Sequence, residues 1–133
     1  MDLFFTVVII LIGIFILFQF FMYLKSKRSV GKIIPYDMIN SEISGKIKNK
    51  KSVLYFHSPS CHNCKVQTPI IEKLKNEFNC FLSIDVSKDL QTAKAFGIMG
   101  TPSLIFLGTK TIEGFYVGVK DENFIREKLK SLV

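Results

Sequence analysis

Two of the three cysteines in this chain of 133 residues lie close together, in the run Cys61-His62-Asn63-Cys64. Such a pair can close into a disulfide or hold a soft metal ion. At the start of a helix both side chains lie on one face, and the free backbone N–H groups there stabilise a thiolate. His62 and Lys65 add positive charge beside it. The spacing therefore predicts a reactive thiol pair, with Cys61 as the nucleophile and the more shielded Cys64 as the resolving thiol.

The third cysteine, Cys80, is predicted to be a free, mostly buried thiol. The alternative is a zinc or copper site that joins Cys61, Cys64, Cys80 and a histidine. Covalent haem attachment is excluded, because Lys65 follows Cys64 where that chemistry needs a histidine. Three cysteines close at most one bridge within the chain, so a fold held together by several disulfides is excluded as well.

The elements that position the pair follow from the hydrophobic pattern. Residues 52–57 form a nearly continuous apolar run, typical of a central strand, and lead into the loop before Cys61. Apolar residues then recur with the helical period as far as Phe78. The other predicted elements are a helix over 36–47 with Met38 on its apolar face, a strand over 81–86, a helix over 88–96 with Leu90 on its apolar face, strands over 103–107 and 111–117, and a helix over 121–132. This order predicts an α/β fold, with a mixed central sheet flanked by helices.

Several segments together carry a resemblance to a known family. Val53-Leu54-Tyr55-Phe56 precedes the cysteine pair, Pro69 follows Cys64 by five residues, and the run over 95–104 contains Gly100-Thr101-Pro102-Ser103-Leu104. With the Cys-x-x-Cys pair, these features make residues 51–132 similar to a thioredoxin. The resemblance implies a thioredoxin-like fold, and the apolar run near the N-terminus separately predicts one helix before it.

The resemblance also implies roles for single residues. Pro102 would be a cis-proline facing the cysteines, and the backbone of Thr101 would pair with an extended substrate, so both are expected to bind substrate. Cys61 and Cys64 are the expected catalytic pair, and the expected active-site loop consists of Ser60, His62, Asn63 and Lys65. A sheet of this kind places Cys80 far from the helix start, which disfavours the zinc or copper site.

Three positions depart from the family pattern. Ser60 stands where thioredoxins usually have tryptophan, Tyr55 stands at the position of their buried acid, and Phe81 stands at that of the lysine that partners the acid. Losing both buried charges together is energetically sensible, since either alone would be unpaired. The sequence then leaves two candidates for the group that accepts the proton of Cys64, water and His57.

The run from Leu3 to Leu24 contains no charged residue. As a helix it would be about 33 Å long, which matches the roughly 30 Å hydrocarbon core of a bilayer. A cleaved signal peptide is the alternative, but the basic start and small-residue cleavage site that it needs are lacking. The sequence thus predicts a transmembrane anchor over 1–24, a basic linker over 25–35 and a thioredoxin-like domain over 36–133.

Basic residues follow the apolar run, so the positive-inside rule favours a cytoplasmic domain. The outer or periplasmic face remains an open alternative, since short anchors sometimes break this rule. The net charge of +7 does not indicate nucleic-acid binding, because the lysines are spread and no aromatic-basic interleaving accompanies them.

The expected function is that of a membrane-tethered thiol-disulfide oxidoreductase that reduces or exchanges protein disulfides. The alternatives are a copper- or zinc-binding module that uses the Cys-x-x-Cys pair and an oxidant that donates its disulfide to folding proteins. No cofactor is expected beyond the Cys61-Cys64 redox pair. The expected partners are protein disulfides or dithiols, the lipid bilayer, and an upstream electron donor such as a thioredoxin reductase or a membrane thiol relay.

Overall fold

A mixed four-stranded sheet forms the centre of the structure, a computed structural model that describes residues 2–132. The strands are β1 (Ser52–His57), β2 (Phe81–Asp85), β3 (Ser103–Leu107) and β4 (Ile112–Val117). Their order across the sheet is β2-β1-β3-β4, with β1 parallel to β2 and antiparallel to β3, and β4 antiparallel to β3. The mixed sheet is therefore as predicted.

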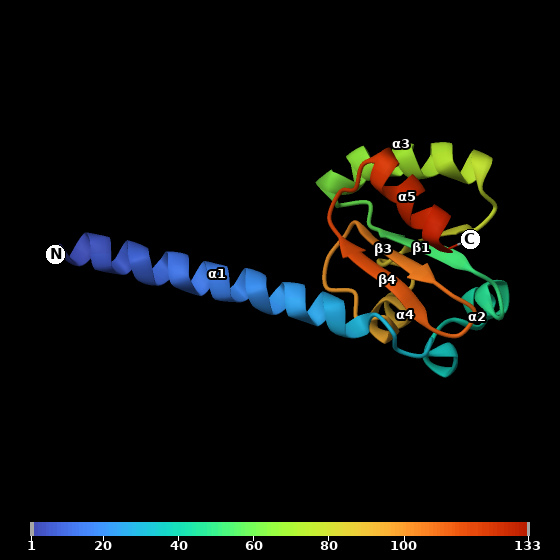
Figure 1. The fold of residues 1–133 in the computed structure, drawn as a ribbon, viewed down its shortest axis with the longest axis horizontal. Helices are drawn as coiled ribbons and strands as arrows, with labels where there is room; N and C mark the ends of the chain where they lie inside the picture. Colours follow the sequence, from blue (N-terminus) through green and yellow to red (C-terminus); the bar gives the residue numbers. More distant parts are fainter. Residues whose placement is uncertain (1, 133) are drawn as a thin grey trace.

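Helices cover both faces of the sheet, as Figure 1 shows. The helices of the described chain are α1 (Leu3–Ser29), the short 3₁₀ helix η1 (Tyr36–Met38), α2 (Ser41–Ile47), α3 (His62–Glu77), α4 (Leu90–Ala95) and α5 (Glu122–Leu132). Helices α3 and α5 lie on one face, and α2 and α4 lie on the other. Alternate side chains of the central strand serve the two cores: Val53 and Tyr55 pack toward α3 and α5, whereas Leu54 and Phe56 pack toward α2 and α4.

Helix α1 projects from the domain as a single long helix. It has a mean hydropathy of 2.9 over its most apolar window, no part of that window is buried in the protein, and it is long and apolar enough to cross a membrane. The helix continues to Ser29, beyond the apolar run, so the first residues of the predicted linker are helical.

The rest of the predicted linker follows the edge of the sheet. Gly31 N–H donates to the Ile112 carbonyl over 2.8 Å, and Ile112 N–H donates to the Lys32 carbonyl over 2.9 Å. Ile33 forms an isolated antiparallel bridge with Thr111. Strand β4 is an edge strand with unpaired backbone groups, and this segment satisfies some of them.

Two predicted helices are shorter than expected. The helix over 36–47 is divided into η1 and α2, because Asn40 leaves the helical conformation and its side chain accepts the N–H of Glu42. Met38 is consequently 62% exposed rather than buried. Asp89 caps α4 one residue before Leu90, and Leu90 is 56% exposed, so the prediction that it packs on the apolar face is wrong.

Candidate active site

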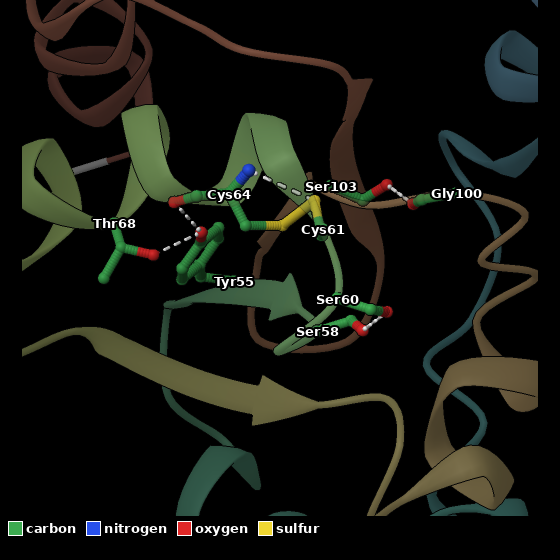
Figure 2. Close-up of a disulfide and its surroundings, with 8 residues drawn as sticks. All are labelled: Tyr55, Ser58, Ser60, Cys61, Cys64, Thr68, Gly100 and Ser103. Carbon is green, nitrogen blue, oxygen red and sulfur yellow. Dashed lines mark hydrogen bonds between the residues drawn. A yellow bond between two sulfur atoms is a disulfide. The ribbon is translucent and has the colours of Figure 1, made fainter.

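The cysteine pair lies where the central strand passes through a short loop into α3. Cys61 is the N-cap residue of α3, and Cys64 lies in the first helical turn. The two form a disulfide with a Cα–Cα distance of 5.3 Å, and Cys61 Sγ accepts the N–H of Cys64 over 3.1 Å (Figure 2). A sulfur at this position thus receives a free amide at the positive end of a helix, an arrangement that favours the thiolate form in the reduced protein.

The two sulfurs differ in their access to solvent. Cys64 is only 4% exposed, whereas Cys61 is partly exposed. A shallow hollow beside them is lined by His57, Ser58, Pro59, Cys61, Cys64, Lys65, Thr68 and Pro69. A reactant can therefore reach the disulfide from the side of Cys61.

The peptide bond between Thr101 and Pro102 is cis, as the resemblance implies. Ser103 pairs with Phe56, near the end of β1 that leads to Cys61, so Pro102 lies at the same end of the sheet as the cysteines. This loop is fixed on both sides: Ser103 Oγ donates to the Gly100 carbonyl over 2.6 Å, and Gly118 N–H donates to the Pro102 carbonyl over 2.8 Å. Pro102 is buried and Thr101 is partly exposed.

The thioredoxin family model matches residues 37–131. This chain belongs to the thioredoxin family. Its Cys61-Cys64 disulfide is a bond of the kind that takes part in thiol-disulfide exchange. Crystalline reduced thioredoxin pre-protein of Schistosoma mansoni has the same fold, with a TM-score of 0.62 at 24% identity over 70% of this chain and 89% of that one.

Two curated relatives show how far the likeness extends. NADPH-dependent thioredoxin reductase 3 of Arabidopsis thaliana is 34% identical over 82 residues, which are 59% of this chain and 16% of that protein. Thioredoxin 2 of Plasmodium berghei (strain Anka) is 30% identical over 110 residues, which are 80% of this chain and 65% of that protein. The chain thus spans less than two thirds of the length of either relative.

Beneath the disulfide of this thioredoxin-family domain lies a neutral hydroxyl pair. The hydroxyl of Tyr55 is 2.9 Å from Thr68 Oγ1 and 3.5 Å from the carbonyl oxygen of Cys64 (Figure 2). Burial raises the pKa of Tyr55, so the phenol stays protonated in the physiological range. Phe81 packs in the same core cluster as Tyr55. These two of the three departures from the family pattern therefore lie in one core, on the same face of the sheet.

The predicted active-site loop surrounds Cys61. Ser60, His62, Asn63 and Lys65 are all exposed, and the Ser60 and Ser58 hydroxyls lie 3.0 Å apart. The ring of His57 stacks on Tyr55 with a centroid distance of 5.3 Å, and it also lines the hollow next to Cys64.

Cys80 lies at the other end of the sheet. Its carbonyl accepts the N–H of Val53 over 2.8 Å, at the start of β1, whereas the disulfide follows the end of that strand. The length of β1 alone is roughly 15 Å, so Cys80 does not join Cys61 and Cys64. Within residues 2–132, no group of three or more His, Cys, Asp or Glu side chains gathers as metal ligands do. Cys80 is a free, partly buried thiol, and burial raises its pKa.

Gln67 is a site residue that sequence analysis missed. It is fully buried, its Nε2 donates to the Lys120 carbonyl over 3.1 Å, and its Oε1 accepts the Lys120 N–H over 2.6 Å. The side chain thus holds the loop before α5 against α3, one turn after Cys64. The signal was present, since Gln67, Ile71 and Leu74 share the buried face of the helix, where a polar residue needs a partner.

Proposed function

We propose that this protein is a membrane-tethered oxidoreductase that reduces or exchanges disulfides in other proteins. The observation that carries the proposal is the unequal disulfide at the start of α3. Its partly exposed sulfur belongs to Cys61, its buried sulfur belongs to Cys64, and the cis peptide before Pro102 lies at the same end of the sheet.

The proposed reaction has two thiol-disulfide exchange steps. In the reduced protein, the Cys61 thiolate attacks one sulfur of a substrate disulfide, and the other substrate sulfur leaves as a thiolate. The Cys64 thiolate then attacks Cys61 Sγ, which releases the second substrate sulfur and forms the Cys61-Cys64 bond. Two electrons have passed to the substrate, and its two thiolates take protons from solvent. An upstream dithiol donor, such as a thioredoxin reductase or a membrane thiol relay, restores the starting state.

The other residues of the site have supporting roles in this proposal. Thr101 and Pro102 position an extended substrate segment across the disulfide, and Ser60, His62, Asn63 and Lys65 form the exposed rim that meets it. The Cys64 thiol loses its proton to His57 or to water in the shared hollow.

The tether is α1, and the basic residues after its apolar run favour a domain on the cytoplasmic side. The direction of electron flow follows from the reduction potential of the pair. A value near or below about −250 mV would make the protein a reductant, whereas one near −120 mV would make it an oxidant.

The test is reduction of a model protein disulfide by the full chain in detergent, with dithiothreitol as electron donor. We expect Cys61→Ser to abolish turnover, Cys64→Ser to accumulate a mixed disulfide at Cys61, and the control Cys80→Ser to retain the wild-type rate. Turnover by Cys61→Ser at the wild-type rate would contradict the proposal. Failure of the wild-type pair to form a disulfide, together with bound copper or zinc in the purified reduced protein, would favour the metal-binding module instead.

A further inference from the structure

A groove of about 520 Å³ lies between the end of α1 and the adjoining faces of β4 and α4. Its apolar wall includes Phe21 and Leu24 from α1, Phe96 from the turn after α4, and Ile112 and Val117 from β4. A hollow of this size and lining is in the range of sites that take small amphipathic molecules.

The charged side chains that line the groove are all positive. Lys25, Arg28, Lys32 and Lys94 line it, and no acidic residue of the described range 2–132 does so. Within the described range, the ion pairs all lie on α2, α3 and α5. None of them includes any of the four cations that line the groove. Clustered cations beside an apolar wall are complementary to a ligand that has a phosphate at one end and hydrocarbon at the other.

The position of the groove along α1 indicates which ligand this is. A hydrocarbon core of about 30 Å takes roughly 20 helical residues, so a span that starts at Leu3 reaches the headgroup layer near Met22. The groove is lined by α1 residues from Phe21 to Ser29, and it therefore begins at the level where phospholipid headgroups lie.

We infer that this groove binds an anionic phospholipid. Lys25, Arg28, Lys32 and Lys94 contact the phosphate and headgroup, and the apolar wall packs on the first methylene groups of an acyl chain. Because Lys94 and the β4 wall belong to the thioredoxin-like domain whereas Arg28 belongs to α1, the lipid bridges the two and fixes the domain on the membrane.

The test is native mass spectrometry of the full chain released from detergent micelles that contain dioleoylphosphatidylglycerol or dioleoylphosphatidylcholine. We expect one phosphatidylglycerol molecule to be retained in preference to phosphatidylcholine. The double variant Lys32→Glu/Lys94→Glu leaves α1 unchanged, and its apparent Kd for phosphatidylglycerol should rise about tenfold or more. The matched control, Lys48→Glu/Lys50→Glu, makes the same change of charge at the turn before β1 and should bind as the wild type does.

Equal retention by the two double variants would overturn the inference, as would equal retention of the two lipids by the wild type. An equimolar amount of inorganic phosphate should not displace the lipid, because phosphate alone gains nothing from the apolar wall. Displacement would assign the groove to free phosphate and overturn the lipid site. If Lys32→Glu/Lys94→Glu does not fold, judged by circular dichroism, the neutral pair Lys32→Gln/Lys94→Gln decides by the same comparison.

Discussion

At the scale of single residues, Tyr55 puts a neutral hydroxyl at the position where the family pattern has a buried acid. Its bond to Thr68 Oγ1 is partly buried and lies beneath Cys64, whose carbonyl oxygen accepts from the same hydroxyl. A carboxylate at this position would need a cation, and Phe81 provides none. The chain therefore keeps the thioredoxin fold without an ion pair at these two positions, and the Tyr55 hydroxyl donates to the backbone carbonyl of Cys64.

We expect Tyr55→Phe to lower the free energy of unfolding by about 1 kcal/mol, because the Thr68 hydroxyl loses its partner in a half-buried place. Chemical denaturation of the full chain in detergent, followed by circular dichroism, measures this change. The matched control is Tyr36→Phe, which removes an exposed hydrogen bond to the Thr109 carbonyl at 3.3 Å and should leave stability within about 0.5 kcal/mol of the wild type. Equal losses in the two variants would contradict the assigned role of Tyr55.

The thiol of Cys80 should react more slowly than that of Cys61. Burial raises the pKa of Cys80, so at neutral pH a smaller fraction of this thiol is thiolate than of an exposed cysteine. The side chain is also partly buried, which limits the access of a reagent to its sulfur. Brief alkylation of the reduced protein between about pH 7 and 9, read by peptide mass spectrometry, should label Cys61 first. Labelling of Cys80 should rise toward the alkaline end of that range, and equal rates at neutral pH would show that Cys80 is not shielded.

At the scale of elements, α3 is fastened to its neighbours at both ends. Near its start, Gln67 holds the backbone of Lys120 through two hydrogen bonds, and near its end Arg126 of α5 forms a bidentate ion pair with Glu77 at 2.7 Å. The first of these connections is buried and the second is exposed. Their contributions should therefore differ in size and in response to conditions.

We expect Gln67→Leu to lower the free energy of unfolding by roughly 1–3 kcal/mol, since it leaves the N–H and the carbonyl of Lys120 without partners. Hydrogen exchange at the Lys120 amide reports the change directly and should become faster. Gln91→Leu, on the exposed surface of α4, is the matched control. Unchanged exchange at Lys120 in Gln67→Leu would show that the loop does not depend on this side chain.

The ion pairs between α3 and α5 should give a small, acid-sensitive contribution. Hydrogen bonds from Arg126 lower the pKa of Glu77, and those from Lys73 and Arg126 lower that of Glu122. Because the folded pKa values lie below the unfolded value of about 4.3, the stabilisation is complete above that pH and is lost as the pH falls through the folded values.

The wild type should therefore exceed Arg126→Gln in stability at pH 7, and the difference should shrink as the pH falls from about 5 toward 3. Denaturation curves of both proteins across that range measure it. Salt should reduce the difference as well, because the pairs are exposed. A difference that stays constant with pH would show that Arg126 acts through its contact with Phe78, whose ring it approaches to 5.9 Å, rather than through the carboxylates of Glu77 and Glu122.

At the scale of the whole molecule, the active-site end of the domain and the apolar helix lie on the same side. Gly118 holds the carbonyl of Pro102, and the preceding residue, Val117, lines the groove with Met22 of α1. Figure 1 shows α1 leaving the domain toward the side where β4 ends and α3 begins. Under the proposal that α1 spans a bilayer, the Cys61-Cys64 disulfide should therefore face the membrane surface, within reach of disulfides that lie close to the headgroups.

A fluorophore on Cys61 tests this orientation without relying on activity. In the background Cys64→Ser/Cys80→Ser, reconstituted in nanodiscs, nitroxide-labelled headgroups should quench this probe strongly. The same fluorophore on Lys50→Cys, in a background with all three native cysteines replaced by serine, should be quenched much less, because Lys50 precedes β1 at the opposite end of the sheet. Equal quenching at the two positions would indicate a domain that reorients freely on its tether.

Local patterns in the sequence determined the apolar helix, the central strand and the place of the cysteine pair. A mostly apolar run without charged residues is long enough to span a bilayer wherever the rest of the chain lies. A strand that leads into Cys-x-x-Cys at a helix start positions both sulfurs within a few residues. The resemblance over residues 95–104 added the cis peptide before Pro102, which the structure confirms.

Contacts between distant segments decided the rest. The linker pairs with β4 because an edge strand needs partners. Leu90 is exposed because Ala93 of α4 and Phe96, its C-cap residue, are the side chains that pack in the core. Gln67 acquires its partner 53 residues away, at Lys120, and the basic groove exists only where α1 meets β4. The periodicity of apolar residues indicates which face of a helix or strand is apolar. Only the tertiary structure determines which residues pack against that face.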